Sequence, residues 1–372
     1  MHPLALLCAL PLAAAAGGAM SQEASPAPEA CVAIELAVDR LACYDRAMQR
    51  QVPTAQEADE AAARARAEAS ALDERPARAG DTSSDVFPHD DDPRRALANA
   101  GRGSLLDSRW ELARDSKLGT FNMRAYKPVY LLPAFWSSSP NTRPTSSADG
   151  QELQMDGVDD VETKFQISFK TKAVENLFGD NGDIWMGYTQ SSRWQVYNSD
   201  NSRPFRETNY EPEVLLVFRN SYSIGGWKGR MAAVGINHQS NGRDNPLSRS
   251  WNRLVFNIGM DRDGWALNLR PWIRVPERNA SDDNPDIDDY MGRGDATLVR
   301  VWPNGHQVSL MLRHSLRAGD QSHGAVQFDW AFPLHDTFRG HLQVFDGYGE
   351  SMVDYNHRAT YIGLGISLME WY

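Results

Sequence analysis

The sequence predicts an all-β fold, a transmembrane antiparallel β-barrel of about 12 strands with a small helical or disordered N-terminal extension. Three observations predict it. Segments of alternating apolar and polar residues recur from about residue 104 onward. Charged residues occupy the face opposite the apolar one. An apolar segment typical of an export signal opens the chain.

The segment 1–19 is expected to be a secretory signal peptide. Its apolar run, residues 4–16, is too short to cross a bilayer as a helix and ends in small residues. No Lys or Arg precedes this run. Cleavage is expected near Ala16 or Ala19.

Residues 20–50 are expected to form a short helical segment that contains Cys31 and Cys43. With Cys8 inside the signal, these two cysteines are an even pair in an exported chain, which favours a disulfide. An unbroken helix between them would hold them about 18 Å apart, so the bridge requires an intervening turn. Two free thiols on one short helix are the alternative.

Residues 51–103 are expected to be a flexible linker. This segment is rich in Ala, Glu and Arg, and most of it has few large apolar side chains. Such a segment cannot bury enough surface to offset the entropy lost on ordering. The barrel domain is therefore assigned to residues 104–372.

The alternation is clearest in segments 265–274, 307–313 and 326–332. Further strands are expected to begin near residues 124, 163, 183, 212, 228, 251, 294, 340 and 359. Together these make about 12 strands, an even number within the range of bacterial barrels.

Two architectures share this alternation, a soluble β-sandwich and a membrane barrel. A sandwich turns its apolar face toward a dry core, whereas a barrel turns it toward lipid and keeps charges inside. The polar rows here carry more charge than a dry core accommodates. Their members include Arg270, Arg274, Arg300, Arg313, Gln327 and Asp329. Aromatic strand ends and a last strand that stops at Tyr372 also favour the outer-membrane barrel.

The bulk properties exclude several classes of function. The formal net charge of -11 argues against nucleic acid as a partner, because phosphate binding needs a cationic face. The mean hydropathy of -0.52 argues against a helical membrane protein. No G-x-S-x-G, P-loop, H-E-x-x-H or C-x-x-C motif is present, so the common soluble hydrolase and metalloprotease scaffolds have no support.

The polar segment 235–253 is the candidate site. Counting by twos from Ile236 reaches His238 and Ser240, and counting back from Leu254 reaches Asn252. Side chains two apart share a face of a strand, so the three polar groups extend lipid-facing apolar rows of two neighbouring strands. Polar groups are unfavourable on that face, a cost that a site acting on lipid would carry.

These residue types suit ester hydrolysis. A serine hydroxyl becomes nucleophilic when a neutral imidazole takes its proton, and an amide oxygen can orient that imidazole. Ser240, His238 and Asn252 would be the nucleophile, the general base and the orienting residue. The alternative is that His238 and Ser240 are solvent-facing rim residues and that Asn252 is an amide at the edge of a turn. Strand parity favours the site without excluding this alternative.

Five blocks of the chain closely resemble the outer-membrane phospholipase A family, in the same order. They span residues 204–212, 237–243, 248–253, 282–287 and 347–351, and the central one reads N-H-Q-S-N-G-R. The resemblance covers roughly residues 120–372 and leaves out the N-terminal hundred.

The resemblance implies a twelve-stranded outer-membrane barrel with its active site facing the outer leaflet at a homodimer interface. By match, Ser240 is the nucleophile, His238 the base and Asn252 the residue that orients it. The implied activity is hydrolysis of the acyl esters of membrane phospholipids, of phospholipase A1/A2 type, with lysophospholipids also accepted. Pairing of two barrels is the implied switch.

The family requires Ca²⁺, a hard cation that polarises the ester carbonyl and prefers oxygen ligands. Matching positions put the ion near Ser248 and the main-chain carbonyl of Arg243, with Ser202 of the partner subunit completing the set. A second, weaker site would match Asp283, but Asn245 stands where the family has an aspartate, which puts that site in doubt.

Two other functions remain open from the sequence. A non-catalytic barrel, a porin or a structural protein, would share the fold without the chemistry, although the intact His, Ser and Asn set disfavours it. A secreted soluble esterase would be extracted without detergent. Glu350 and Asp354 are expected to lie inside the barrel, paired with arginines, and to serve structure rather than catalysis.

Overall fold

The structure is a computed structural model, and the chain divides into two units between residues 82 and 83. The described residues are 27–34, 36–48, 104–113, 116–146, 148, 154–155, 157–277, 282–334 and 338–372. The predicted signal peptide, 1–19, and linker, 51–103, lie outside these residues, so both remain predictions.

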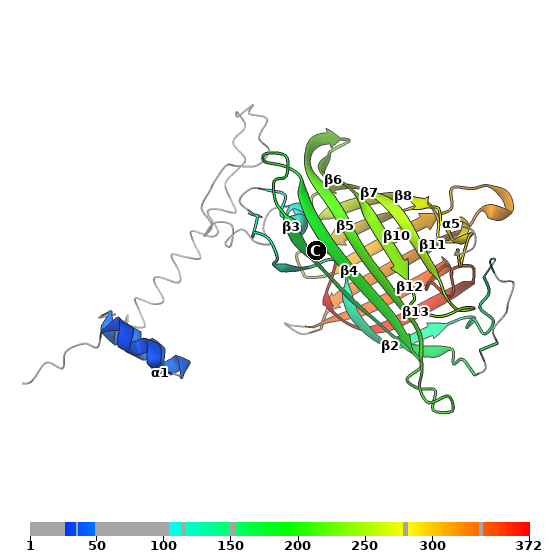
Figure 1. The fold of residues 1–372 in the computed structure, drawn as a ribbon, viewed down its shortest axis with the longest axis horizontal. Coiled ribbons are helices and arrows are strands. Elements are labelled where there is room, and N and C mark those ends of the chain that lie inside the picture. The colour runs from blue at the N-terminus through cyan, green and yellow to red at the C-terminus, as the bar shows by residue number, and fades with distance from the viewer. Residues whose placement is uncertain are drawn as a thin grey trace, which may run out of the picture. The chain divides into compact units, whose positions relative to one another are not determined.

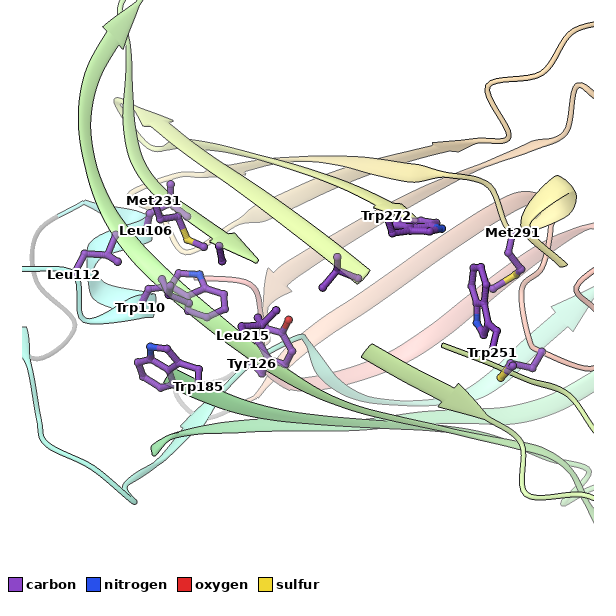
Figure 2. Packing of buried hydrophobic residues seen from close by; sticks show 14 of the residues in the cluster. Leu106, Trp110, Leu112, Tyr126, Trp185, Leu215, Met231, Trp251, Trp272 and Met291 are labelled. Carbon is purple, nitrogen blue, oxygen red and sulfur yellow. The ribbon is translucent and has the colours of Figure 1, made fainter. Parts of the chain in front are cut away.

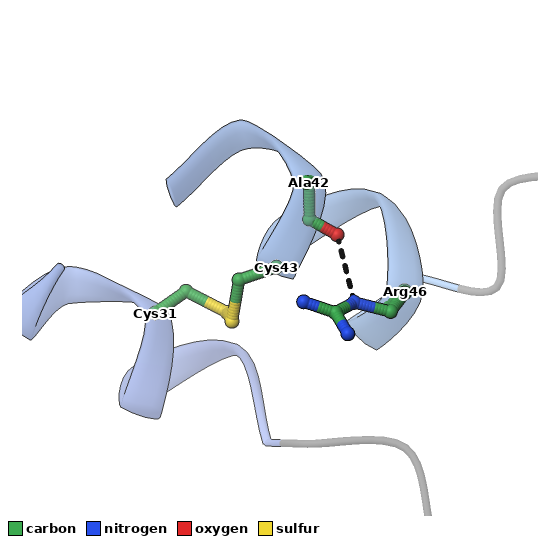
Figure 3. Close-up of a disulfide and its surroundings, with 4 residues drawn as sticks. All are labelled: Cys31, Ala42, Cys43 and Arg46. Carbon is green, nitrogen blue, oxygen red and sulfur yellow. Dashed lines mark hydrogen bonds between the residues drawn. A yellow bond between two sulfur atoms is a disulfide. The ribbon is translucent and has the colours of Figure 1, made fainter. Parts of the chain in front are cut away.

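The described part of the first unit is a disulfide-linked pair of short helices (Figure 3). The 3-10 helix η1 (Pro28–Ala33) carries Cys31, and α1 (Ala37–Ala47) carries Cys43. Extended backbone at Ile34 and Leu36 separates the helices, and the two cysteine Cα atoms lie 5.6 Å apart across the S–S bond. The predicted turn and disulfide are confirmed, and the free-thiol alternative is wrong.

The second unit is a closed antiparallel β-barrel (Figure 1). Its strands are β1 (Met123–Ala125), β2 (Val129–Ser137), β3 (Val161–Val174), β4 (Asp183–Trp194), β5 (Phe205–Ile224), β6 (Trp227–Ser240), β7 (Ser250–Arg262), β8 (Trp265–Val275), β9 (Gly294–Val301), β10 (Gln307–His314), β11 (Gly324–Pro333), β12 (Arg339–Tyr348) and β13 (Arg358–Met369). From β2 onward, strands that follow each other in the chain pair with each other, and β13 pairs with β2 to close the sheet.

The first barrel strand is interrupted. β1 pairs with β3 at residues 169–171, whereas β2 pairs with β3 at residues 161–166. The 13 described strands therefore occupy 12 positions, since β1 and β2 share one. Pro128 lies between the two pieces, and proline cannot donate to a strand ladder. The predicted twelve-stranded barrel is confirmed.

The two faces of the barrel differ as strand parity predicts. Ile236, Ile258 and Ile273 are 64%, 38% and 60% exposed on the outer face, whereas Arg253 and Arg270 are 6% and 7% exposed inside. One predicted inner residue is misplaced. Arg300 was predicted to face the interior, but it is the register partner of Trp265, whose ring is exposed on the outer face. Register partners share a face of the sheet, so Arg300 lies on the lipid side. Its guanidinium lies between the rings of Trp265 and Trp302, at 5.2 and 5.5 Å, where an aromatic pair and the strand end accommodate a cation.

One cluster of buried apolar residues gathers toward two regions of the barrel interior (Figure 2). One surrounds α4 (Leu105–Trp110), a short helix that Ser104 caps by accepting a hydrogen bond from the Asp107 N–H. Trp110 meets Trp185 edge-on at 5.9 Å. The other region contains Trp251 and Met291, the latter directly after α5 (Ile287–Tyr290).

The two ends of the barrel have connections of different length. Short turns join β5 to β6 at 225–226 and β7 to β8 at 263–264, whereas longer loops span 241–249, 276–293 and 349–357. In bacterial barrels the short turns face the periplasm and the longer loops face outward. The 241–249 loop, and with it the candidate site, therefore belongs to the outer side. Among the described residues, no helix is long and apolar enough to cross a membrane.

Candidate active site

The three predicted catalytic residues lie together on the outer face of β6 and β7. His238 and Asn252 are directly opposite each other in the strand register. Ser240, two residues further along β6, is opposite Ser250. All three candidate side chains are half-buried. Ser240 follows His238 by two residues, which spaces them by about 6.6 Å along the strand on one face. The exposed apolar side chains of Val214 and Ile236 continue this face toward the membrane.

The imidazole has a defined orientation. His238 Nδ1 and Asn252 Oδ1 are 2.9 Å apart. An amide oxygen only accepts hydrogen bonds, so this contact requires a proton on Nδ1 and leaves Nε2 as the basic nitrogen. That tautomer is the one in which a histidine can take a proton from a serine. The pair can therefore act as an oriented general base.

The inner face of the same strands holds the site rigid. Gln239 Oε1 accepts a hydrogen bond from the indole of Trp251 at 3.0 Å, and the Arg253 guanidinium lies 4.2 Å from the same ring. Asn237 binds Arg253 and donates to Glu211 at 3.0 Å. These residues alternate with the candidate catalytic ones, so their packing fixes the backbone from which His238 and Asn252 project.

The 241–249 loop is ordered by its own polar groups. Asn241 Nδ2 donates to the Leu247 carbonyl at 2.8 Å, and its Oδ1 accepts from the Arg249 N–H at 2.9 Å. Arg249 is 1% exposed and donates to the Thr145 carbonyl at 2.8 Å. Asn284 binds both main-chain groups of Ser250, each at 2.9 Å, and so ties the 276–293 loop to the start of β7.

The structure brings some of the predicted calcium ligands together. Ser248 Oγ donates to a carboxylate oxygen of Asp283 at 2.5 Å, so two oxygen ligands from different loops are adjacent. Arg243 lies in the same loop as Ser248, and its side chain donates to the carbonyls of Phe205 and Arg206. Ser202 is exposed in the neighbouring 195–204 loop, with left-handed backbone at φ 60°.

These ligands fit a hard cation in their chemistry, because hydroxyl, carbonyl and carboxylate oxygens are what calcium prefers. In the described residues, no group of three or more His, Cys, Asp or Glu side chains could hold a metal ion. Asn245 is exposed in the loop.

Sequence reasoning missed one residue that contacts the predicted triad. Asn252 Nδ2 donates to Glu277 Oε1 at 3.0 Å, and Glu277 is half-buried just beyond the end of β8. The parity rule could have found it, because Ile273 and Val275 face outward and the next step of two reaches Glu277.

A closed barrel whose lipid-facing wall carries an oriented His–Asn pair beside a serine defines a class, the membrane β-barrels with a hydrolase-type site. The family model for phospholipase A1 matches residues 106–368. The chain belongs to the phospholipase A1 family, whose members are ester hydrolases, and it is an outer-membrane β-barrel that hydrolyses phospholipids.

Relatives agree with this assignment. A Neisseria meningitidis serogroup B protein, provisionally named a phospholipase A1, is 36% identical over 98% of this chain and 95% of its own. The phospholipase A1 of Klebsiella pneumoniae is 35% identical over 72% of this chain and 88% of its own.

Solved structures share the fold. The outer membrane phospholipase A from Escherichia coli superposes with a TM-score of 0.60 at 32% identity, covering 67% of this chain and 95% of that one. The Salmonella typhi outer membrane phospholipase dimer with bound calcium gives 0.61 at 32% identity, covering 68% and 94%.

Proposed function

We propose that this chain is a calcium-dependent phospholipase A1/A2 that also accepts lysophospholipids, with Ser240, His238 and Asn252 as its triad. The observation that carries the proposal is the 2.9 Å contact between His238 Nδ1 and Asn252 Oδ1 on the lipid-facing wall. Lipid chains offer no hydrogen bonds to a polar pair on that wall, so its position is costly. A catalytic role accounts for that cost.

In the proposed mechanism, His238 Nε2 takes the hydroxyl proton of Ser240 as the serine oxygen attacks the ester carbonyl. Asn252 keeps the imidazole in the required tautomer and accepts from Nδ1–H while the ring is charged. His238 then returns the proton to the leaving alcohol, and water repeats the sequence on the acyl-serine. The apolar wall formed by residues such as Ile236 would hold the acyl chain.

Ser248 and the carbonyl of Arg243 would hold the calcium ion, with Ser202 of the partner subunit as a further ligand. When bound, the ion would polarise the ester carbonyl and stabilise the oxyanion. Asp283 would belong to the second, weaker calcium site, which its contact with Ser248 puts next to the first. The dimer of the Salmonella typhi relative, which contains calcium, supports both the ion and the pairing.

The test is fatty-acid release from phospholipid micelles by refolded protein, with calcium and with chelator, for the native chain and Ser240→Ala. We expect release only from the native chain with calcium. Ser250→Ala is the matched control, since Ser250 lies on the same face one strand away. Release that survives Ser240→Ala would discard the nucleophile, and release in chelator would discard the calcium requirement.

Dimerisation as the switch has its own test. Crosslinked dimer yield should rise together with activity as calcium and substrate are added. A fully active monomer would contradict the switch and leave the chemistry untouched.

A further inference from the structure

We propose that Glu277 is a fourth member of the site, a positioning residue that fixes the orientation of the Asn252 amide. The inference rests on the proposed triad. It begins from a chain of hydrogen bonds across three adjacent strand ends. His238 on β6 contacts Asn252 on β7 at 2.9 Å, and Asn252 contacts Glu277, two residues past the end of β8, at 3.0 Å.

The chemical problem lies in the asparagine. A carboxamide has nearly the same shape after a 180° flip, but the flip exchanges its acceptor oxygen for a donor NH₂. With NH₂ facing Nδ1, the imidazole would carry its proton on Nε2 instead. His238 could then no longer take the proton of Ser240. An aspartate in this position would not have the ambiguity, because both of its oxygens accept.

Glu277 removes the ambiguity. An ionised carboxylate only accepts hydrogen bonds, so it binds Asn252 through Nδ2 and directs Oδ1 toward His238. Its negative charge also polarises the amide in the direction that favours the imidazolium formed during the reaction. Asn252 and Glu277 together would thus do what a single aspartate does in a Ser-His-Asp triad.

The fold places the carboxylate for this purpose. Val275 is the register partner of Asn252, so the chain leaves β8 directly beside the asparagine. Pro276 follows and restricts the backbone just before Glu277. Glu277 is half-buried and lies on the outward row that Ile273 and Val275 begin.

The alternative role is structural, a rim carboxylate whose bond to Asn252 only steadies the loop. The two roles differ in what depends on Asn252. A positioning residue acts through the amide, so its removal should have no effect once the amide is gone. A structural residue should affect the enzyme equally in both backgrounds.

The experiment compares Glu277→Ala and Glu277→Gln with the native chain, and repeats both in an Asn252→Ala background. Phospholipid hydrolysis is measured with calcium as kcat and KM, and folding is checked by circular dichroism. We expect kcat to fall about three- to tenfold in both single variants, because losing a charged hydrogen bond releases the amide. KM should stay within about twofold, since substrate contacts are unchanged. Glutamine should not rescue, because its amide can donate as well as accept.

In the Asn252→Ala background, removing Glu277 should change kcat by less than about twofold. An unchanged kcat in Glu277→Ala, or the same loss in both backgrounds, would overturn the inference. Asp346→Asn is the matched control, and it should leave kcat unchanged. Asp346 is a partly exposed carboxylate near the end of β12 that leads into the 349–357 loop. Ser240→Ala in the same assay separates the two proposals. If it abolishes activity while Glu277 variants remain normal, only the role of Glu277 fails.

Discussion

Polar side chains have different surroundings on the inner and outer faces of this barrel. Inside, charged groups are numerous and meet each other, as in Arg193–Glu350 at 2.7 Å and Arg270–Glu213 at 2.6 Å. At the candidate site on the outer face, His238, Asn252 and Glu277 form a short hydrogen-bonded chain near the strand ends, and Glu277 is its one carboxylate. Polar groups inside are explained by their partners, whereas those facing lipid call for a function.

The interior network also accounts for the two carboxylates of the 349–357 loop, Glu350 and Asp354. Glu350 binds both Arg193 and Lys164, and Asp354 binds Arg206 at 2.8 Å. The predicted location of both carboxylates, inside the barrel and paired with arginines, is confirmed. Their structural role stays a prediction. The carboxylates of this loop neutralise the cations Arg193, Lys164 and Arg206, which are buried inside the barrel.

The largest expected effect is on the outer face. His238→Ala should lower phospholipid hydrolysis about 10²–10⁴-fold, because the general base is lost. Its free energy of unfolding should stay within about 1 kcal/mol of native, since little packing depends on a half-buried rim side chain. Micelle hydrolysis and urea unfolding of the same preparation check both. Retained activity would mean that His238 is not the general base. Loss of folding would mean that this outer-face residue stabilises the barrel as the inner ion pairs do.

The next effect is on the inner face and on stability. Glu350→Gln should lower the free energy of unfolding by about 3 kcal/mol, because Arg193 and Lys164 would remain buried without their anion. Urea unfolding in detergent micelles measures it. Asp346→Asn is the control, since the exposed Asp346–Arg358 pair contributes only about 0–1 kcal/mol. Equal effects of the two variants would mean that burial does not distinguish inner from outer pairs.

The smallest effect appears only in acid. Burial by itself would raise the pKa of Glu350, but the charges of Arg193 and Lys164 outweigh it and hold that pKa below its ordinary value. Arg206 likewise overcomes burial and lowers the pKa of Asp354. The unfolded chain then binds protons at higher pH than the folded one. The stabilisation is complete above the ordinary carboxyl pKa, about 4, and is lost as pH falls further.

Unfolding midpoints measured from pH 6 to pH 2 test this titration. The native barrel should lose stability below about pH 4, and Glu350→Gln should show a shallower decline because one titrating group is missing. Parallel acid curves for the two proteins would show that other carboxylates control the decline.

Several elements were predictable because they depend on local patterns. Alternation located most strand starts to within a few residues, and β7, predicted near 251, begins at Ser250. The strand predicted near 212 was placed too late, because β5 begins at Phe205. Parity put His238 and Asn252 on one face, where the register pairs them. The spacing of Cys31 and Cys43 required a break in the helix, and the extended backbone at Ile34 and at Leu36 provides it.

Other features were missed because they depend on groups far apart in the chain. Arg300 was assigned to the interior from its charge, yet Trp265 and Trp302 accommodate it outside. The short helix α4 was not predicted, since six residues carry little periodicity and its burial depends on Trp185. The interruption between β1 and β2 was missed although Pro128 marks it.

The sequence by itself determined the strand order, the two faces and the candidate triad, because strand geometry repeats every two residues and a barrel exposes one face to lipid. Only the tertiary structure decided which amide atom faces the imidazole, and that Ser248 meets Asp283 from another loop. Hydrogen bonds are short and directional, so they depend on how separate strand ends and loops come together rather than on local pattern.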